Sequence, residues 1–372
     1  MLKVVDLVYY CHDEFDKPSQ VIEKHRPTLG FTEFIEGRMN YEIVRHLNYK
    51  GKETVNEIPY AFFKRKNVPW QIPFETHAYI RSLKPDIVVV HGLIFPLQVI
   101  ALRRTLGKKV MIVLQHHADK PAFSVRRIFQ KIADKHVDAY LFTSTAIAKP
   151  WIEQKVIRNE EKIFELVEAA ALVKKLDKQT CKQKLGLAGD HNFLWVGRLD
   201  ENKDPLTILK AFAKYVPVNS SAKLFMIYHT EDLLPRIKSF ISNNDHLHKH
   251  IHLIGEVDKE LLAYWYNASD FFILGSHEEA GGYALLEAMS VGCIPVVASN
   301  PSFKKILDND DIGFMFEPGN ERELEKILNK VTAINVNERS AKVEKYFNDN
   351  LGYKKSAENI VELLKKLILI KH

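Results

Sequence analysis

Cysteine is scarce in this sequence of 372 residues, and the three that occur, Cys11, Cys181 and Cys293, lie far apart and are odd in number. They form neither a disulfide framework nor a closely spaced pair of metal ligands, which indicates a reducing compartment. No group of acidic residues, histidines and cysteines has the spacing of a dedicated metal cage, so no metal is predicted.

Long apolar runs are also missing. No stretch of about 20 apolar residues occurs, so no transmembrane helix is expected. The first residues, MLKVVDLVYYCHDEFD, are interrupted by Lys3, Asp6 and Asp13, which favours a first strand and its loop over a secretory signal. Together with the few cysteines, this predicts a cytoplasmic protein.

Charge is unevenly distributed along the chain. Residues 1–180 contain 29 Lys and Arg against 21 Asp and Glu, whereas residues 181–372 contain 24 against 26. Basic clusters in the first half are Lys64-Arg65-Lys66, Arg103-Arg104 and Arg126-Arg127. They indicate either a solvated basic surface or a face that meets a phosphorylated acceptor or the anionic inner face of a membrane. Nucleic acid is not an expected partner, because no basic-aromatic module or zinc spacing accompanies the charge.

Short runs rich in Val, Ile and Leu alternate with helix-length amphipathic segments. In the first half the runs are residues 4–10, 86–92, 110–117 and 139–145, and in the second half residues 192–198, 222–229, 252–257, 270–276 and 294–299. Helix-length segments follow, among them 95–105, 205–215 and 261–268. Strands that are apolar on both faces belong in parallel sheets covered by helices. The pattern predicts an α/β protein with two Rossmann-like, doubly wound domains.

The predicted domain boundary lies in the polar segment KKLDKQTCKQKLGLAGDHN (174–192), which contains Gly186 and Gly189 and precedes a new strand. We therefore expect a first domain at 1–178 and a second at 179–352. In the segment 355–370, apolar residues recur every three or four positions, which is typical of an amphipathic helix.

The most informative stretch is SHEEAGGYALLEAMSVGCIPVVAS (276–299), which leaves a predicted strand, passes Gly281 and Gly282, and enters a helix near Tyr283. Ligands of open α/β sheets bind at such carboxyl ends, and glycine lets a ligand approach the backbone. The first amides of the helix, at Gly282, Tyr283 and Ala284, suit a phosphate or sugar oxygen.

Two glutamates belong to this stretch. Glu279 precedes the predicted helix and Glu287 lies inside it, one turn past Tyr283, so both can line one ligand site at different depths. The structural alternative makes Glu279 a helix cap and Glu287 a solvated side chain. The neighbouring Ala288 and Met289 argue against that alternative for Glu287, because an unpaired carboxylate is costly in a closely packed helix.

The second stretch, FLWVGRLDENKDP (193–205), places Arg198 and Lys203 in the turn after another predicted strand. Two cations five residues apart can hold a diphosphate from two sides, the guanidinium as a fork and the ammonium as a mobile point charge. Cations in surface turns are common, so Arg198 and Lys203 indicate a diphosphate site only in combination with the stretch that contains Glu279 and Glu287.

Four motifs occur in order: VGRLDENKDP, IGEV, ASDFFILGSHEEAGGYALLEAMSVGCIPVVAS and GFMFEPGN. In this combination the sequence resembles glycosyltransferase family 4, the retaining group 1 glycosyltransferases of GT-B fold, over residues 192–320. The resemblance implies two Rossmann-like domains that face a central cleft, with a C-terminal helix (353–372) crossing back to the first domain.

The resemblance also implies roles for particular residues. Glu279 matches the glutamate that contacts the hydroxyls of the donor sugar, and Glu287 matches the one that binds the ribose. Arg198 and Lys203 match the cations that hold the diphosphate. The backbone from Ala280 to Ala284 lies beside the donor, and the nucleobase rests near Gly255, Glu256 and Val257. A histidine at a strand end of the first domain reaches the transferred sugar, and this is His117, with His116 as the alternative.

The activity implied is a retaining, metal-independent transfer of a hexose from a nucleotide-diphosphate sugar, with UDP or GDP as the nucleotide. A glycan or lipid-linked acceptor of the cell envelope is the expected acceptor, and no further cofactor is needed. Two alternatives share the donor site: a nucleotide-sugar epimerase of the same fold, which uses no acceptor, and a non-catalytic protein that binds the nucleotide sugar.

The sequence departs from the family pattern at three places. Gly281 stands where a phenylalanine is frequent, HTEDLLP (229–235) replaces a glycine-rich turn, and the glycine pair after the first strand is missing, with Gly30 as a substitute candidate. These departures leave the sugar, the base and the acceptor open.

The remaining candidates are weaker. His91 follows a strand, and a structural and a ligand-binding role are equally expected. Ser144 is predicted to be a helix N-cap and not a nucleophile, because no histidine–acid partner can be argued for it. Asp13, Glu14 and Asp16 are expected to form a solvated acidic loop.

Overall fold

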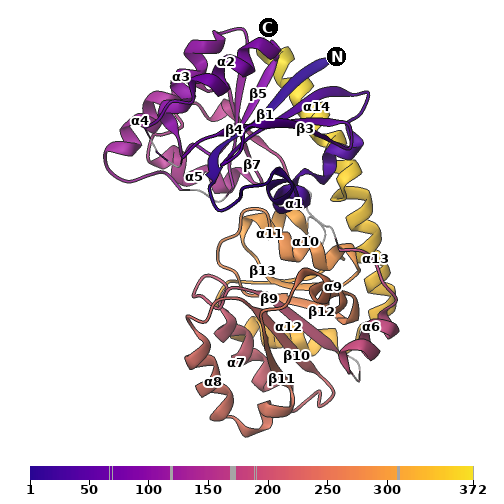
Figure 1. The fold of residues 1–372 in the computed structure, drawn as a ribbon. Coiled ribbons are helices and arrows are strands. Elements are labelled where there is room, and N and C mark those ends of the chain that lie inside the picture. Colours follow the sequence, from indigo (N-terminus) through magenta and orange to yellow (C-terminus); the bar gives the residue numbers. More distant parts are fainter. Residues whose placement is uncertain are drawn as a thin grey trace. The chain divides into compact units, whose positions relative to one another are not determined.

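The computed structural model describes residues 1–66, 68, 70–117, 120–167, 173–187, 189, 191–307 and 311–371. The chain divides into two compact units, Met1–Ala169 with Tyr353–His372, and Ala170–Gly352 (Figure 1). The division thus falls nine residues before the predicted boundary at 178/179. The reason is that the intervening segment is bonded to the second unit: the Leu176 amide donates to Asn267 Oδ1 (2.8 Å), and the Lys178 ammonium pairs with Asp270 (2.6 Å).

The first unit contains an eight-stranded sheet in the order β3-β4-β2-β1-β5-β6-β7-β8. Its strands are β1 (Leu2–His12), β2 (Met39–Leu47), β3 (Gly51–Val55), β4 (Ile58–Lys64), β5 (Ile87–His91), β6 (Met111–Gln115), β7 (Ala139–Phe142) and β8 (Ile163–Glu165). Every pairing is parallel except that of the edge strand β3 with β4. An antiparallel edge on an otherwise parallel sheet is common in doubly wound folds.

Helices cover both faces of this sheet. They are α1 (Pro18–Leu29), η1 (Gly30–Phe34), α2 (Phe74–Leu83), α3 (Pro96–Leu106), α4 (Val125–Ala133), η2 (Asp134–His136), α5 (Thr145–Glu153), η3 (Glu160–Lys162) and α14 (Tyr353–Lys371). Side chains alternate between the faces along β5: Ile87 and Val89 pack in the core with α1, η1 and α14, whereas Val88 and Val90 pack in the core with α2, α3 and α5. The sheet is therefore buried on both sides, as its continuous apolar strands predict.

The C-terminal helix α14 completes one of these two cores. Ile360, Leu364 and Leu367, at helical spacing, are buried against the sheet. Gly30 makes room for the first residue of α14, because a Cβ at Gly30 would lie 2.5 Å from the Tyr353 ring. Tyr353 then donates to the Pro27 carbonyl (2.7 Å). Gly30 therefore packs against α14.

The second unit contains a six-stranded, fully parallel sheet in the order β11-β10-β9-β12-β13-β14. Its strands are β9 (Asn192–Gly197), β10 (Lys223–Tyr228), β11 (Ile251–Gly255), β12 (Phe271–Leu274), β13 (Ile294–Ala298) and β14 (Phe314–Phe316). Counted within the unit, this is the order 3-2-1-4-5-6 of the Rossmann fold.

The helices of the second unit are α6 (Lys178–Leu185), α7 (Pro205–Tyr215), α8 (Leu234–Ser242), η4 (Asp245–Lys249), α9 (Lys259–Ala268), α10 (Tyr283–Ser290), α11 (Pro301–Ile306), α12 (Glu321–Val331) and α13 (Val336–Asn350). They form two groups: α7 packs against α12, while α6 packs against α9, and α10 against α9 and α13. Both units are doubly wound α/β structures, as predicted.

All nine predicted strands are confirmed, and the helix predicted near Tyr283 begins there. The sequence did not reveal β2, because this strand carries two buried polar side chains, Arg45 and His46, which interrupt its apolar pattern. It also did not reveal β3, β4, β8 or β14. Of these, β3, β8 and β14 are edge strands, and β8 and β14 have only three residues each. Within the described residues, no helix is both long and apolar enough to cross a membrane.

Candidate active site

The strand order of the second unit creates one position where neighbouring strands send their connections in opposite directions. The chain runs from β9 to β10 on one side and returns through β11 to β12 on the other side of β9, so that β9 and β12 are paired neighbours (Figure 1). Loops that leave adjacent carboxyl ends at such a switch point form the ligand sites of open α/β sheets. The two predicted motifs, 198–204 and 275–282, are these two loops.

Asn202 joins the two loops. Its side chain donates to the Glu278 carbonyl (3.0 Å) and accepts from the Glu278 amide (3.0 Å), and its own carbonyl accepts from the His277 amide (2.8 Å). Gly275 allows this close approach, since a Cβ there would lie 2.9 Å from the Asp204 carbonyl oxygen. The cation motif and the glutamate motif are therefore held in a fixed relation.

Lys203 and Glu279 meet where the loops join. Their half-buried side chains form an ion pair, the Lys203 ammonium donating to Glu279 Oε1. Asp200 links the second cation to this pair, because its carboxylate accepts from the Lys203 amide (2.9 Å) and from Arg198 Nε (3.1 Å). Arg198 is exposed, so its guanidinium lies at the solvent side of the cluster. The structure thus brings three predicted residues together around Asp200.

The glutamate loop is also fixed from the opposite side. Ser302 Oγ, at the start of α11, donates to the carbonyls of Glu279 (2.5 Å) and Ala280 (3.0 Å), and Asn300 Nδ2 donates to the Ser276 carbonyl (3.0 Å). Sequence reasoning missed Asn300 and Ser302, as it missed Asn202 and Asp200. The signal was present in the motif strings, where Asp200 and Asn202 stand between the two cations.

Gly282 opens helix α10. It adopts a left-handed conformation (φ 62°) and, being a glycine, supplies no side-chain cap to the helix. Because the first amides of a helix lack intrahelical acceptors, they are suited to phosphate oxygens. A Cβ at Gly281 would lie 3.0 Å from the Tyr283 ring, so the Tyr283 side chain fills the space beside residue 281. This explains glycine at the position where the related family often has phenylalanine.

Glu287, one turn into α10, faces the neighbouring helix α9. Tyr266 on α9 donates to Glu287 Oε2 (2.9 Å). Burial raises the pKa of Glu287, against the opposing effects of the Tyr266 hydrogen bond and the Lys259 charge. Glu287 therefore lies beside α9, the helix that follows β11 after a connection in which Gly255 (φ 83°) turns the chain before the exposed Glu256 and the half-buried Val257.

In the first unit, a buried carboxylate leads to the predicted histidine. Asp6 on β1 pairs with Arg45 (2.6 Å) and accepts from Tyr41 Oη (2.7 Å) and from His91 Nε2 (2.9 Å). Burial alone would raise the pKa of Asp6, but Arg45 and His91 together hold it well below its ordinary value. Asp6 is therefore an anion at every physiological pH.

His91 connects the Asp6 carboxylate to His117 through its two ring nitrogens. His91 Nδ1 lies 2.7 Å from His117 Nε2, and the two rings are nearly coplanar (3°). A carboxylate only accepts, so His91 Nε2 carries a hydrogen, and in the neutral ring Nδ1 must then accept from His117 Nε2. His116, the alternative candidate, is buried against Phe142 and Trp151.

The other candidates have structural partners. Ser144 Oγ accepts from the Ala146 amide (3.3 Å), which confirms its prediction as an N-cap. Glu14 pairs with Lys24 (2.9 Å), and Asp16 accepts from Asn48 (3.0 Å). Among the described residues, no three His, Cys, Asp or Glu side chains are grouped so that they could hold a metal ion.

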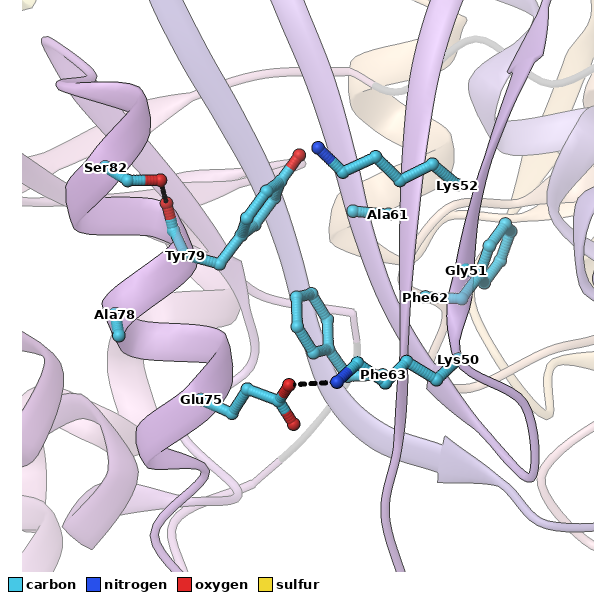
Figure 2. A pocket seen from close by; sticks show the side chains of 10 residues that line it. All are labelled: Lys50, Gly51, Lys52, Ala61, Phe62, Phe63, Glu75, Ala78, Tyr79 and Ser82. Carbon is cyan, nitrogen blue, oxygen red and sulfur yellow. Dashed lines mark hydrogen bonds and ion pairs between the residues drawn. The ribbon is translucent and has the colours of Figure 1, made fainter.

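A pocket of about 440 Å³ lies elsewhere in the first unit, between α2 and the strands β3 and β4 (Figure 2). Lys52 lies over the Tyr79 ring (4.5 Å to its centroid), and Lys50 pairs with Glu75. None of the residues predicted from the motifs lines this pocket. Its cations already have partners within the pocket, so we assign it no part in the function.

Both the fold and part of the sequence resemble those of known proteins. Residues 177–350 match the family model of glycosyl transferases group 1. No curated protein sequence matches the chain.

Solved structures share its fold over nearly the whole length. Sucrose-phosphate synthase from Thermosynechococcus elongatus superposes with a TM-score of 0.71 at 14% identity, over 99% of this chain and 100% of that one. A glycosyltransferase from Rickettsia africae gives 0.72 at 15% identity, over 99% of each chain. Anabaena HepE in complex with UDP and glucose gives 0.70 at 14%, over 98% and 100%. Residues 177–350 thus match the glycosyl transferases group 1, and the whole chain has the GT-B fold that these solved structures share.

Proposed function

We propose that the chain transfers a hexose from a nucleotide-diphosphate sugar to a glycan or lipid-linked acceptor, with retention of the anomeric configuration and without a divalent metal. The observation that carries the proposal is the cluster of Arg198, Lys203 and Glu279 around Asp200, at the switch point of the second sheet. A diphosphate needs cations on more than one side, and this cluster supplies two.

Each predicted donor contact has a place in this proposal. The diphosphate lies against Arg198, Lys203 and the amides between Ala280 and Ala284 at the start of α10. Glu279 holds hydroxyls of the donor sugar, and Glu287 holds the ribose. The base lies near Gly255, Glu256 and Val257, which the position of Glu287 beside α9 supports. UDP is the first nucleotide to test, since the HepE structure contains UDP and glucose.

The Lys203–Glu279 ion pair has a consequence for donor binding. A diphosphate competes with Glu279 for the Lys203 ammonium, so the donor replaces one charge partner with another. Departure of the sugar leaves extra negative charge on the phosphate oxygens. Cations and helix amides that are already in position stabilise this charge most strongly in the transition state.

The acceptor binds on the first unit, near His117. Asp6 and His91 orient His117, so that His117 can hold hydroxyls of the transferred sugar or the acceptor. Donor and acceptor thus bind on different units, and the proposed reaction takes place on the cytoplasmic side of the membrane.

The experiment that tests the proposal is a thermal-shift panel of UDP, GDP and ADP and their sugars, followed by product analysis by NMR. One nucleotide is expected to raise Tm by several degrees, because a ligand bound at 100 times its Kd adds about 2.7 kcal/mol of stability. Turnover should persist in EDTA, and the product should keep the anomeric configuration of the donor. Stabilisation by none of the nucleotides would refute the proposed donor site.

The epimerase alternative is separated by leaving out the acceptor. An epimerase converts the donor sugar alone, whereas the transferase proposed here shows only slow hydrolysis. A non-catalytic binding protein would be stabilised by the nucleotide sugar and show turnover under neither condition.

A further inference from the structure

Helix α4 in the first unit is attached to its neighbours through polar groups. Gln130, in the middle of the helix, is buried, its Nε2 donating to the Leu93 carbonyl (2.9 Å) and its Oε1 accepting from the Ala122 amide (2.9 Å). Ala133 is buried in the same core as α3. These contacts fix the rotation of the helix about its axis.

The rotation turns an apolar stripe of α4 outward. Val125, Ile128 and Ile132, spaced three and four residues apart, are 63%, 57% and 41% exposed, and Phe123 just before the helix is 83% exposed. Residues at this spacing share one face of a helix. Surface helices normally bury such a stripe against the core, and here the core side is occupied by a glutamine instead.

Positive charge surrounds this stripe. Residues 120–135 contain five Lys and Arg and a single acidic residue, Asp134, which is buried and accepts from Tyr140 Oη (2.9 Å). Arg127 lies over the Phe123 ring (5.7 Å to its centroid). Lys131 borders a shallow hollow that Lys155 and Arg158 also line. No acidic side chain within residues 120–135 is thus left at the surface to neutralise the cations.

We define the α4 face as Phe123, Val125, Ile128 and Ile132 with the flanking cations Arg126, Arg127 and Lys131. We propose that the α4 face docks on the surface of an anionic lipid bilayer, with the four apolar side chains below the headgroups and the cations at the phosphates. A helix with an apolar face and a cationic rim binds in this way, and each Lys or Arg near the surface strengthens binding about fivefold.

The charge of the face argues against a second copy of the chain as its partner. In a two-fold dimer the same patch lies on both sides of the interface, so Arg126, Arg127 and Lys131 would meet their own copies. An anionic membrane satisfies the cations and accepts a small apolar area. This inference is independent of the proposed donor chemistry.

The test is sedimentation of the full chain with vesicles of phosphatidylcholine alone or with 30% phosphatidylglycerol. We expect binding to the anionic vesicles at least about tenfold tighter than to the neutral ones, weakened by 0.5 M NaCl. Phe123→Ser with Ile128→Ser should weaken binding at least about tenfold, because two exposed side chains lose their apolar burial in the lipid. The matched control, Val218→Ser with Leu369→Ser, changes two equally exposed apolar residues and should bind like the unaltered chain.

A second pair of variants tests the charge. Arg126→Gln with Lys131→Gln should weaken binding about tenfold or more, whereas Lys304→Gln with Lys345→Gln, in the second unit, should not. Equal binding to neutral and anionic vesicles, or retention of binding in both α4 variants, would overturn the proposal. So would concentration-dependent dimers that disappear in Phe123→Ser with Ile128→Ser. Nucleotide stabilisation should be unchanged in every variant, which separates this inference from the donor site.

Discussion

The two units have the same architecture but differ in charge and surface. The first unit contains 31 Lys and Arg against 22 Asp and Glu, and the second contains 22 against 25. Of the fourteen large apolar residues found exposed in the described part of the chain, twelve belong to the first unit and two, Val218 and Tyr283, to the second. One doubly wound fold thus carries two different kinds of surface.

The polar residues of the two units are also organised differently. In the second unit, the site consists of two short loops, each continuous in sequence and each following a strand. In the first unit, the residues come from distant parts of the sequence and meet only in the folded sheet: Asp6 from β1, Tyr41 and Arg45 from β2, His91 from β5, and His117 from the segment after β6. A site built from loops that are continuous in sequence can be recognised from the sequence, whereas a site assembled from residues distant in sequence cannot.

The largest difference expected between the units is their response to acid. In the first unit, burial lowers the pKa of His25 to about 3, of His46 to about 3 and of His77 to about 4. Their pKa values in the folded protein lie below the value of 6.5 in the unfolded chain. Below about pH 6.5 the unfolded chain therefore binds more protons than the folded protein, and the free energy of unfolding falls with pH. Between pH 7 and pH 5 these three residues should lower the free energy of unfolding by about 5 kcal/mol.

Urea titration and hydrogen exchange at pH 7 and pH 5 measure this difference. Amides of the first unit should lose protection at pH 5 before those of the second, where burial lowers the pKa of His252. In His46→Gln the dependence on pH should become weaker by about a third. Equal loss of protection in both units would show that these histidines do not set the acid response.

The next largest effect belongs to the diphosphate cations of the second unit. Arg198→Ala with Lys203→Ala removes both cations, and we expect turnover to fall by about 10³-fold, as for other groups that stabilise transition-state charge. Arg236→Ala with Lys210→Ala is the matched control, since both residues are exposed cations of the same unit paired with glutamates. Survival of turnover within about tenfold would remove Arg198 and Lys203 from the mechanism.

A smaller effect is expected for the positioning residue of the first unit. His91→Gln interrupts the connection between Asp6 and His117, and kcat should fall about 10- to 100-fold while KM for the donor stays unchanged. The pH dependence of kcat should change as well, because the hydrogen bond between His91 Nδ1 and His117 Nε2 is lost. His229→Gln, an exposed histidine of the second unit, serves as the control. A fall in kcat without a changed pH profile would indicate a purely structural role.

The smallest effect concerns the connection between the two loops. Asn202→Ala removes two side-chain hydrogen bonds at about 1 kcal/mol each, so donor affinity should fall by up to about 30-fold by isothermal titration. Asn335→Ala also removes a hydrogen bond, at the start of α13, and should lower Tm without changing donor affinity. If both variants bind the donor equally well, Asn202 does not organise the site.

Much of the fold could be read from the sequence, because buried parallel strands are apolar on both faces and stand out as continuous runs. The start of α10 at Tyr283 was also predictable, since paired glycines before an apolar helix mark such an entry. Strand β2 was not predictable, because it contains two buried polar residues. Arg45 pairs with Asp6 on β1, and His46 contacts the Val8 carbonyl on β1 and Thr76 on α2. A single sequence contains no sign of which polar residues will find such partners.

The sequence by itself determined the two α/β units and the residue types that follow β9 and β12, because strand periodicity and loop composition are local properties. Only the tertiary structure decided that Lys203 would pair with Glu279, that Asp6 would reach His117 through His91, and that α4 would turn its apolar stripe outward. Each of these depends on which strands become neighbours and how a helix is rotated against the sheet. Those choices are made by packing between segments distant in sequence, where local patterns carry no information.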